Sequence, residues 1–481
     1  MFTNARRIAP APLCYFLIGA AALLLQGVAN AVEKDRPLHT DLPFIDGAWQ
    51  QIASNPDLGK LSTKLQQPVD FAIWQAADGT WQLWSCIRHT NCGGKTRLLY
   101  GWEAKQLTDE KWRPVGVKME ADTRLGETAG GLQAPHVVQH DGKYSLLYGD
   151  WQNICLATGR DGKTFSRHVL PNGKTSLFSE GNGANTRDIC AVKIGDQWYG
   201  YYTAFPNHQG AVYCRTSPDL RKWSEPTVVA FGGRAGTGQF AAECPQVIER
   251  DGIYYLFRTQ IYGHGARTSV YWSTDPLKFG INQDREHFLT ELPLAAPEIV
   301  RHDGQDYIVA LRDDLQGIQI AKLGWKKLPK IGKAIFNLDD RAEQKRWNVD
   351  GQLGSVFSNS ERAWFAPQTE YFISTGELEA NQVDDQLTGV VESPAFKIES
   401  PLLAAHLSGG TDADKLYVAI VDATTGEVLQ RLSSQRQGNT LDVQFLDVQK
   451  LQGRKVKLRI VDESTAEWGR INFGGLYEAV P

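Results

Sequence analysis

The sequence predicts an all-β fold, in which a five-bladed β-propeller is followed by a C-terminal antiparallel β-sandwich. Three observations predict this fold: one hairpin pattern recurs five times, helical periodicity is almost absent, and the pattern stops near residue 328. A repeat of about fifty residues with several strands per unit is typical of propeller blades.

Each copy of the pattern has a small or proline-containing start, an apolar strand, an Asp-Gly or Gly-Asp turn, and a second strand rich in aromatic residues. In the first copy, for example, the sequence reads DFAIWQAADGTWQLWSC. The copies begin at Asp70, Gln133, Arg187, Glu243 and Ala295, and their turns lie at Asp78, Asp141, Gly195, Asp251 and Asp303. The turns are 63, 54, 56 and 52 residues apart. Such a turn between two strand-like runs predicts a β-hairpin, so five copies predict five blades.

The pattern ends at the basic stretch LGWKKLPKIGKA, residues 323–334, which we interpret as a solvated hinge. Beyond it, segments such as KLYVAIVDATTGEVLQRL alternate apolar and polar residues between turns, which predicts an antiparallel sandwich. We therefore expect an N-terminal lead-in at residues 32–60, the propeller at 61–328 as the catalytic domain, and an accessory sandwich at 335–481, with a boundary near Ile335.

The N-terminus predicts export. Arg6 and Arg7 precede an apolar run and the small-residue site Ala29-Asn30-Ala31, so we expect residues 1–31 to be a signal peptide and the mature chain to be secreted or periplasmic. Removing the two arginines leaves a net charge of (51 − 2) − 55 = −6. This mild acidity argues against nucleic acid or an anionic membrane as a partner, and we expect a monomer.

Six cysteines remain after cleavage. The close pair Cys86 and Cys92 can form a disulfide in an oxidising compartment. The other four fall singly in strand-like runs, where small buried apolar side chains are the simpler interpretation, although their connectivity stays open. No cysteine spacing is typical of a zinc site, and we expect neither a metal nor another cofactor.

Three copies carry an acid at or just before the start of the first strand: Asp70, Asp188 and Glu243. In a propeller the first strands of all blades converge on one end of the central channel, so these carboxyls would meet. Like charges raise one another's pKa, which yields a protonated acid beside an ionised base. This is the equipment for glycosidic bond cleavage. The alternative is that the acids only cap turns. Glu298 in the fifth copy is offset from Glu243 by three positions, and we expect it to be peripheral.

Further residues are candidates for substrate binding. Trp74, Trp151 and Tyr262 follow first or second strands and can stack on a sugar face, although most aromatic residues of a propeller pack between blades. Arg187 can keep Asp188 ionised or contact a hydroxyl. His136 and His264 can bind sugar hydroxyls, and a buried or loop histidine without a ligand is the alternative.

The local sequences Arg187-Asp188 and Glu243-Cys244-Pro245 resemble motifs of the five-bladed glycoside hydrolases of families 32 and 43, with family 32 the closer. The resemblance covers residues from about 70 to 323, and the segment behind them resembles the C-terminal module of family 32. It implies that Asp70 is the nucleophile, that Glu243 is the acid/base and that Asp188 assists them.

One departure affects the substrate. Family 32 places its nucleophile in a Trp, Asn, Asp, Pro, Asn, Gly motif, whereas this chain reads QQPVDFAIWQ. Fructan specificity is therefore in doubt, and Asp70 can be a nucleophile or, as in family 43, a general base. The separation of the carboxyls would distinguish retention, at about 5 Å, from inversion, at roughly 6.5 to 9.5 Å.

The leading hypothesis is an exported glycoside hydrolase that cleaves oligo- or polysaccharides, with furanosidic or pentose sugars favoured. A catalytically silent, glycan-binding propeller is the alternative, because the first motif is altered. The segment RDGKTF, residues 160–165, resembles the Asp-box turn of sialidases, but those enzymes also need an arginine triad and a tyrosine nucleophile.

Overall fold

The structure is a computed structural model that describes residues 41–282, 287–359, 370–379, 382–435 and 437–480. Strands dominate these residues, which confirms the prediction of an all-β chain. The predicted signal peptide at 1–31 lies outside the described residues. None of the helices in the described part of the chain has the length and apolar character that a membrane crossing requires.

Five antiparallel sheets follow one another along residues 41–327 of the described chain. The first contains β2 (Gln67–Gln75), β3 (Trp81–Arg88), β4 (Leu98–Ala104) and β5 (Arg113–Met119). The second contains β6 (Gln133–His140), β7 (Lys143–Gly149), β8 (Ile154–Gly159), β9 (Ser166–Arg167) and β10 (Ser176–Phe178). The third contains β11 (Arg187–Ile194), β12 (Gln197–Ala204), β13 (Ala211–Ser217) and β14 (Thr227–Phe231).

The fourth sheet contains β15 (Glu243–Arg250), β16 (Ile253–Ile261), β17 (Arg267–Ser273) and β18 (Phe288–Leu292). The fifth contains β19 (Glu298–His302), β20 (Gln305–Leu311), β21 (Gly317–Lys327) and β1 (Asp41–Ser54). The first two strands of every sheet form the hairpin that the repeated pattern predicts. At Asp141-Gly142, Asp251-Gly252 and Asp303-Gly304 both turn residues have positive φ, which is the geometry that matches the twist of a two-residue hairpin.

The expected lead-in at 32–60 and the expected hinge both need correction. Residues 41–54 form β1, which pairs with β21 as the outermost strand of the fifth sheet, because that sheet draws only three strands from its own end of the chain. The basic stretch is also taken up by strands: β21 ends at Lys327, and β22 (Lys330–Ala334) pairs with β35 (Ile471–Val480). Only Leu328 and Pro329 lie between them.

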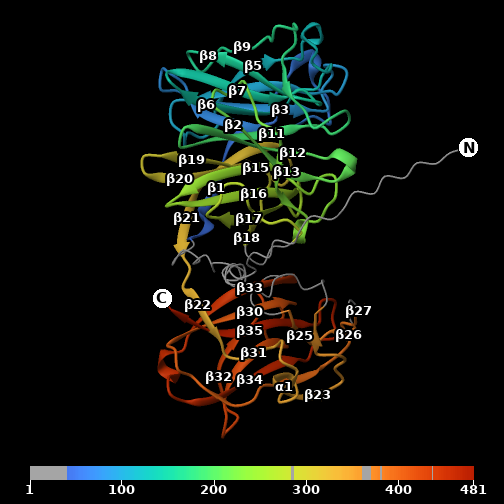
Figure 1. Ribbon diagram of the computed structural model, residues 1–481, viewed down its shortest axis with the longest axis vertical. Helices are drawn as coiled ribbons and strands as arrows, with labels where there is room; N and C mark the ends of the chain where they lie inside the picture. Colours follow the sequence, from blue (N-terminus) through green and yellow to red (C-terminus); the bar gives the residue numbers. More distant parts are fainter. Residues whose placement is uncertain (1–40, 283–286, 360–369, 380–381, 436, 481) are drawn as a thin grey trace, which may run out of the picture. The chain divides into compact units, whose positions relative to one another are not determined.

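The first strands of the five sheets contact one another in the cyclic order β2, β6, β11, β15, β19 and back to β2. Figure 1 shows these sheets in blue to yellow. At the head of each first strand lies one non-glycine residue with positive φ, and we call these five the strand-head residues: Asp70 (38°), Ala134 (29°), Asp188 (59°), Cys244 (43°) and Ala296 (50°). In four of the five sheets the pairing with the second strand is irregular at this residue.

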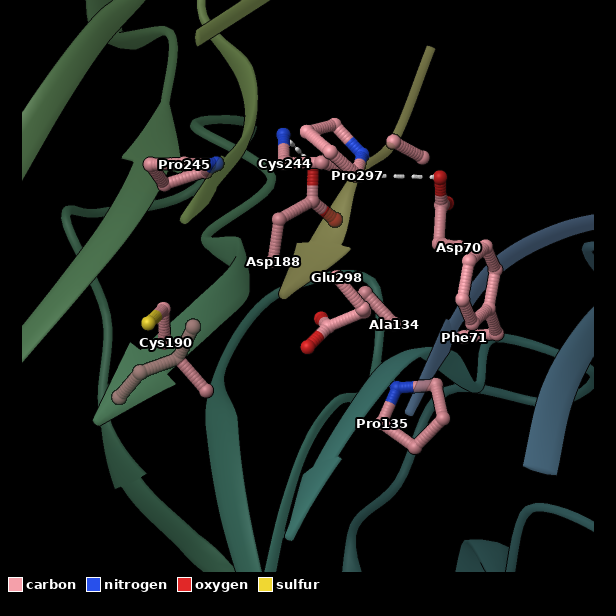
Figure 2. A pocket seen from close by; sticks show the side chains of 12 residues that line it. Asp70, Phe71, Ala134, Pro135, Asp188, Cys190, Cys244, Pro245, Pro297 and Glu298 are labelled. Atoms are coloured by element: carbon pink, nitrogen blue, oxygen red, sulfur yellow. Dashed lines mark hydrogen bonds between the residues drawn. The ribbon is translucent and has the colours of Figure 1, made fainter. Parts of the chain in front are cut away.

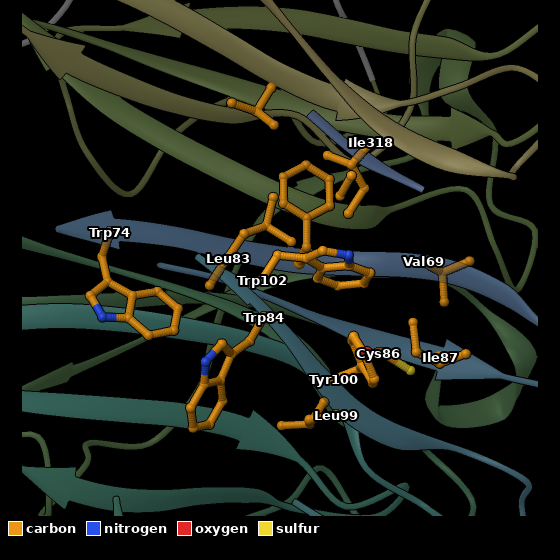
Figure 3. Packing of buried hydrophobic residues seen from close by; sticks show 14 of the residues in the cluster. Val69, Trp74, Leu83, Trp84, Cys86, Ile87, Leu99, Tyr100, Trp102 and Ile318 are labelled. Carbon is orange, nitrogen blue, oxygen red and sulfur yellow. The ribbon is translucent and has the colours of Figure 1, made fainter. Parts of the chain in front are cut away.

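The largest apolar cluster lies in the first two sheets and the adjoining strands, and Figure 3 shows part of it. Trp74, Trp84 and Trp102 are all buried in it. Trp74 contacts Trp84 edge to face at 5.6 Å between ring centroids, and its indole N–H donates to the carbonyl of Gly162 at 2.8 Å. Trp74 thus packs within the first sheet and against the loop after β8 of the second, and its ring lies in the apolar cluster, which argues against the predicted stacking on a sugar.

Two further sheets lie beyond residue 329 in the described chain, with the short helix α1 (Arg341–Gln344). One contains β22, β24 (Phe357–Ser358), β25 (Phe372–Ser374), β30 (Leu402–Gly409), β33 (Gly438–Asp447) and β35. The other contains β23 (Asn348–Gly351), β28 (Gly389–Glu392), β29 (Phe396–Lys397), β31 (Leu416–Asp422), β32 (Val428–Leu432) and β34 (Lys455–Asp462). A two-stranded ribbon joins β26 (Glu377–Glu379) and β27 (Gln382–Val383). The two larger sheets share one apolar cluster that includes Leu403, Val418, Ile460 and Phe473.

The pairing of β1 predicts that its buried residues stabilise the five-sheet part. Ile52 is fully buried in the largest apolar cluster, so Ile52→Ala should lower the free energy of unfolding by about 2 to 5 kcal/mol. Asp46→Ala, at an exposed position of the same strand, should change it by less than about 0.5 kcal/mol. Urea unfolding measures both, and equal values for the two variants would contradict a packed β1.

Candidate active site

A pocket lies where the five first strands converge. The space that the centre of a water molecule can occupy in this pocket is about 20 Å³, which is enough for one or two waters. Every first strand contributes to its lining: Asp70, Phe71, Ala134, Pro135, Asp188, Ile189, Cys190, Cys244, Pro245, Ala296, Pro297 and Glu298. Figure 2 shows the carboxyl groups of Asp70, Asp188 and Glu298 around this pocket. Two of the three predicted acids therefore line one pocket, as the strand-start argument expected.

Asp70 is buried and held by two neighbours. Its Oδ1 accepts a hydrogen bond from the hydroxyl of Tyr262 at 2.9 Å and one from the thiol of Cys244 at 3.1 Å. Burial and the charge of Asp70 raise the pKa of Tyr262 well above its usual value, so the phenol stays protonated as a donor. Tyr262 thus contacts a carboxylate, a role different from the sugar stacking that its position suggested.

Glu243 lies beside the pocket and forms a bidentate ion pair with Arg187. Nη2 of Arg187 donates to Oε1 at 2.5 Å and Nε donates to Oε2 at 3.2 Å, whereas Asp188 lies 3.6 Å from Nε. Both Arg187 and Glu243 stand one residue before a strand-head residue on adjacent first strands, so their side chains point the same way. Asp188, the expected partner of Arg187, lies within ion-pair distance of it, but the closer bidentate contact of the guanidinium is to Glu243.

Burial opposes the charge of Arg187, but Glu243 and Asp188 favour it, and the net effect raises its pKa. Asp188 behaves in the opposite way. Burial is the largest cause and the charge of Asp70 the next, and together they outweigh Arg187 and raise the pKa of Asp188 well above its usual value. A buried carboxyl between two other carboxylates holds a proton more readily than an ordinary aspartate, which argues against the expectation that Asp188 stays ionised.

The contacts of Asp188 agree with this protonation state. Its Oδ2 accepts the backbone N–H of Cys244 at 3.2 Å, while its Oδ1 is buried without a hydrogen-bond partner among the described residues. A protonated carboxyl or a ligand hydroxyl would satisfy such an atom. Asp188 is therefore placed both to hold a proton and to contact a substrate.

Glu298 lines the pocket, so the expectation that it is peripheral needs correction. It stands two residues after the strand-head residue Ala296, and Figure 2 shows its carboxyl group among the side chains that line the pocket. Glu298 is partly exposed to the pocket and otherwise enclosed by protein, and this burial raises its pKa to about 8. The offset that distinguishes it in the sequence therefore does not remove it from the pocket.

Three other predicted residues lie nearby with different surroundings. His136 is buried, its Nε2 lies 3.4 Å from the carbonyl oxygen of Ala191, and burial lowers its pKa to about 4, so the ring is neutral at neutral pH. His264 is exposed on the loop after β16. Trp151 is partly exposed, with Lys95 4.8 Å and Arg97 5.1 Å from its ring centroid. His264 and Trp151 stay predictions for substrate binding.

Arg97 escaped the sequence analysis. Burial opposes its charge, but its contact with the Cys86 sulfur and the charge of Asp70 favour it, and its pKa is raised. Its Nη1 lies 3.9 Å from the sulfur of Cys86. A lone arginine in a loop gives no sequence signal of its own, since only the fold brings it near Asp70.

All six cysteines of the described chain are free, so the predicted Cys86–Cys92 disulfide is not formed. Cys155, Cys190 and Cys214 are buried in strands, as the simpler interpretation expected. The fourth, Cys244, lies at the centre of the site.

The ligand atoms of Asp70, Asp188 and Cys244 lie within 4.8 Å of one another, a spacing that a metal ion could use. Burial and the charges of Asp188 and Asp70 raise the pKa of the Cys244 thiol well above its usual value. Without an ion these groups form a hydrogen-bonded cluster, in which the Cys244 thiol donates to Oδ1 of Asp70 at 3.1 Å and lies 3.1 Å from the hydroxyl of Tyr262.

Comparisons with known proteins give relatives of one kind. No family model matches the chain. A curated protein of Aspergillus flavus, a probable arabinan endo-1,5-alpha-L-arabinosidase C, is 26% identical over 208 residues, which cover 42% of this chain and 61% of the relative. Its counterpart in Aspergillus oryzae matches equally. The chain thus spans about three fifths of the length of these curated relatives.

Among solved structures, a thermostable family-43 glycoside hydrolase has a TM-score of 0.42 at 16% identity and covers 57% of this chain and 92% of its own. An endo-arabinase of Bacteroides thetaiotaomicron has a TM-score of 0.42 at 12% identity and covers 56% and 96%. The expected preference for family 32 finds no support in these comparisons.

The raised pKa of Glu298 predicts a pH-dependent stability. Its pKa is about 8 in the folded state and about 4.5 in the unfolded state, so the folded state binds more protons between these values. The free energy of unfolding should therefore fall as the pH rises from 5 to 8. This decrease should be on the order of 3 kcal/mol larger in the parent than in Glu298→Gln, which lacks the titrating group. Urea unfolding at both pH values measures this. The control Glu110→Gln, at an exposed site, should show the same pH dependence of stability as the parent. The same pH dependence in Glu298→Gln would contradict the burial of Glu298.

Proposed function

We propose that the chain is a glycoside hydrolase that cleaves glycosidic bonds of polysaccharides built from pentose sugars in furanose form, such as arabinan. One observation carries this proposal: Asp70, Asp188 and Glu243, far apart in sequence, meet at the heads of three adjacent or converging strands with Arg187 among them. Stability gives no reason to collect three buried carboxyls. Glycosidic cleavage needs such groups in different protonation states.

The proposal includes an architecture. The five sheets would be the blades of a propeller, because their first strands contact one another in a closed cyclic order. The two sheets beyond residue 329, which share one apolar cluster, would form an accessory β-sandwich. We place the boundary at Leu328-Pro329, between β21 and β22. An exported monomer that meets its polysaccharide outside the cytoplasm fits the expected signal peptide.

The catalytic steps follow from the charges. Asp188 lies beside Glu243, whose charge and hydrogen bond help to raise the pKa of Asp188, so the two carboxyls can share one proton. This Asp188–Glu243 pair would supply the proton that the leaving oxygen needs, and Asp70 would act as a nucleophile or as the base that activates water. Tyr262 and Cys244 hold the Oδ1 of Asp70 by hydrogen bonds, which orients its free oxygen. Arg187 compensates the carboxylate of Glu243 until a substrate enters.

The substrate class rests on the named relatives, which are called arabinan endo-arabinosidases, and on the lack of the asparagines that the fructan enzymes use. Because the chain spans about three fifths of their length, the substrate has to be tested directly. Purified protein should release reducing ends or arabinose from linear arabinan and hydrolyse an aryl arabinofuranoside, and Asp70→Asn should abolish both. Tight binding of arabinan without hydrolysis would favour the alternative of a glycan-binding propeller.

Glu243→Gln should lower kcat on arabinan by about 10²- to 10⁴-fold, because the proton donor pair is broken. The loss should be much smaller on activated aryl-glycosides, whose leaving groups depart without protonation. Stability should fall as well, since Arg187 loses its buried partner, so rates are compared well below the unfolding temperature. Glu249→Gln, an exposed position on the same strand, is the matched control and should behave like the parent. Equal losses on both substrates would contradict the role of Glu243.

Asp188→Asn tests the second member of the pair. Asn matches the shape of a protonated Asp, so folding should be nearly unchanged, while activity should drop on the order of 10- to 100-fold because the proton is no longer shared. The anomer first released, followed by NMR, should be that of the parent. A switch of anomer would mean that Asp188 itself attacks or activates water.

A further inference from the structure

Phe240 is an aromatic side chain that is exposed to solvent and is not explained by packing of the fold. It is 60% exposed, the highest value of any aromatic residue among the exposed apolar side chains of the described chain. It stands three residues before Glu243, on the loop that joins β14 to β15. Its only ring partner among the described residues is Phe205, edge to face at 6.1 Å, on the loop after β12.

The loop that carries Phe240 is firmly held. The buried guanidinium of Arg258 donates from Nε to the carbonyl of Ala241 at 2.8 Å and lies within 3.4 Å of the carbonyls of Gly232 and Gly236. The carbonyl of Gly238 accepts the N–H of Gly210, at 3.2 Å, which ties this loop to the loop of Phe205. An exposed ring on a loop with so many anchors is held in place before any ligand arrives.

The two rings lie on the proton-donor side of the site. Phe205 is mostly buried, and the guanidinium of Arg187 lies 5.1 Å from its ring centroid while binding Glu243. The contacts therefore run from Phe240 through Phe205 and Arg187 to Glu243. Asp70 belongs to the first sheet, whereas these four residues belong to the third and fourth sheets or the loops that follow their strands. The two phenylalanines therefore lie on the side of the site that carries Glu243 and not on the side that carries Asp70.

We propose that Phe240, supported by Phe205, binds the sugar unit of the leaving group. This inference rests on the proposed function, because the leaving oxygen must lie beside the proton donor. A flat ring matches the CH-rich face of a sugar and contributes without adding charge to a site that is already crowded with it. Phe240 would thus favour substrates that continue past the cleaved bond.

The test compares two substrates in the full-length mature protein. A linear α-1,5-arabino-oligosaccharide has sugar units on both sides of the cleaved bond, and α-L-arabinofuranosyl fluoride has a single atom as its leaving group. Phe240→Ala should lower kcat/KM about tenfold on the oligosaccharide, mainly through KM, and leave the fluoride unchanged. Phe240→Tyr should retain most of the parent value. Phe44→Ala, another partly exposed phenylalanine on β1, should match the parent on both.

Equal losses on both substrates, or no loss on the oligosaccharide, would overturn the role of Phe240. A parent that hydrolyses neither substrate would instead overturn the proposed function. In that case calorimetric binding of the oligosaccharide still decides the inference, because Phe240→Ala should weaken it about tenfold and an unchanged affinity would reject the subsite.

Discussion

The site depends on a backbone constraint that is repeated five times. Near the start of each first strand lies a non-glycine residue in the left-handed region, which costs on the order of 1 kcal/mol or more per position. The kink turns the side chain of that residue towards the common axis and breaks the regular pairing with the next strand. Five short side chains then line one pocket. Their identities differ, with Asp in two sheets, Ala in two and Cys in one. The repeated backbone geometry therefore positions the side chains, and the residue type at each position decides whether it carries a reactive group.

Charge is distributed around this frame by position relative to the kink. Arg187 and Glu243 each stand one residue before a strand-head residue, and they pair with each other across adjacent first strands. Residues at the strand head face the pocket, and Asp188 there has no cation as close as the one that Glu243 has. The position of Arg187 therefore decides that Glu243 is the better compensated carboxylate, and burial together with the charge of Asp70 raises the pKa of Asp188.

Much of this could be predicted from the sequence because it is local. Hairpins follow from turn residues and alternation, and an acid at a strand start follows from alignment on those turns. The partner of Arg187 could not be predicted, since it depends on side-chain direction across two strands. Trp74 was assigned to the site although it packs between sheets, because exposed and packed aromatic residues look alike in a repeat. Glu298 was set aside because a shift along a strand can mean depth as well as distance from the axis.

The pairing of β1 with β21 also has a consequence for how the chain reaches its fold. Ser54 pairs with Gly317, and 317 − 54 = 263 residues separate them. The earliest strand of the described chain thus waits for β21, the last strand of the five sheets, and the cost of closing so long a loop falls at the end of assembly. Until then, β1 and the outer edge of β21 carry unpaired backbone groups, which can recruit strands from other chains. The interval between the synthesis of these two strands is therefore the period in which the unfinished fifth sheet is most open to aggregation.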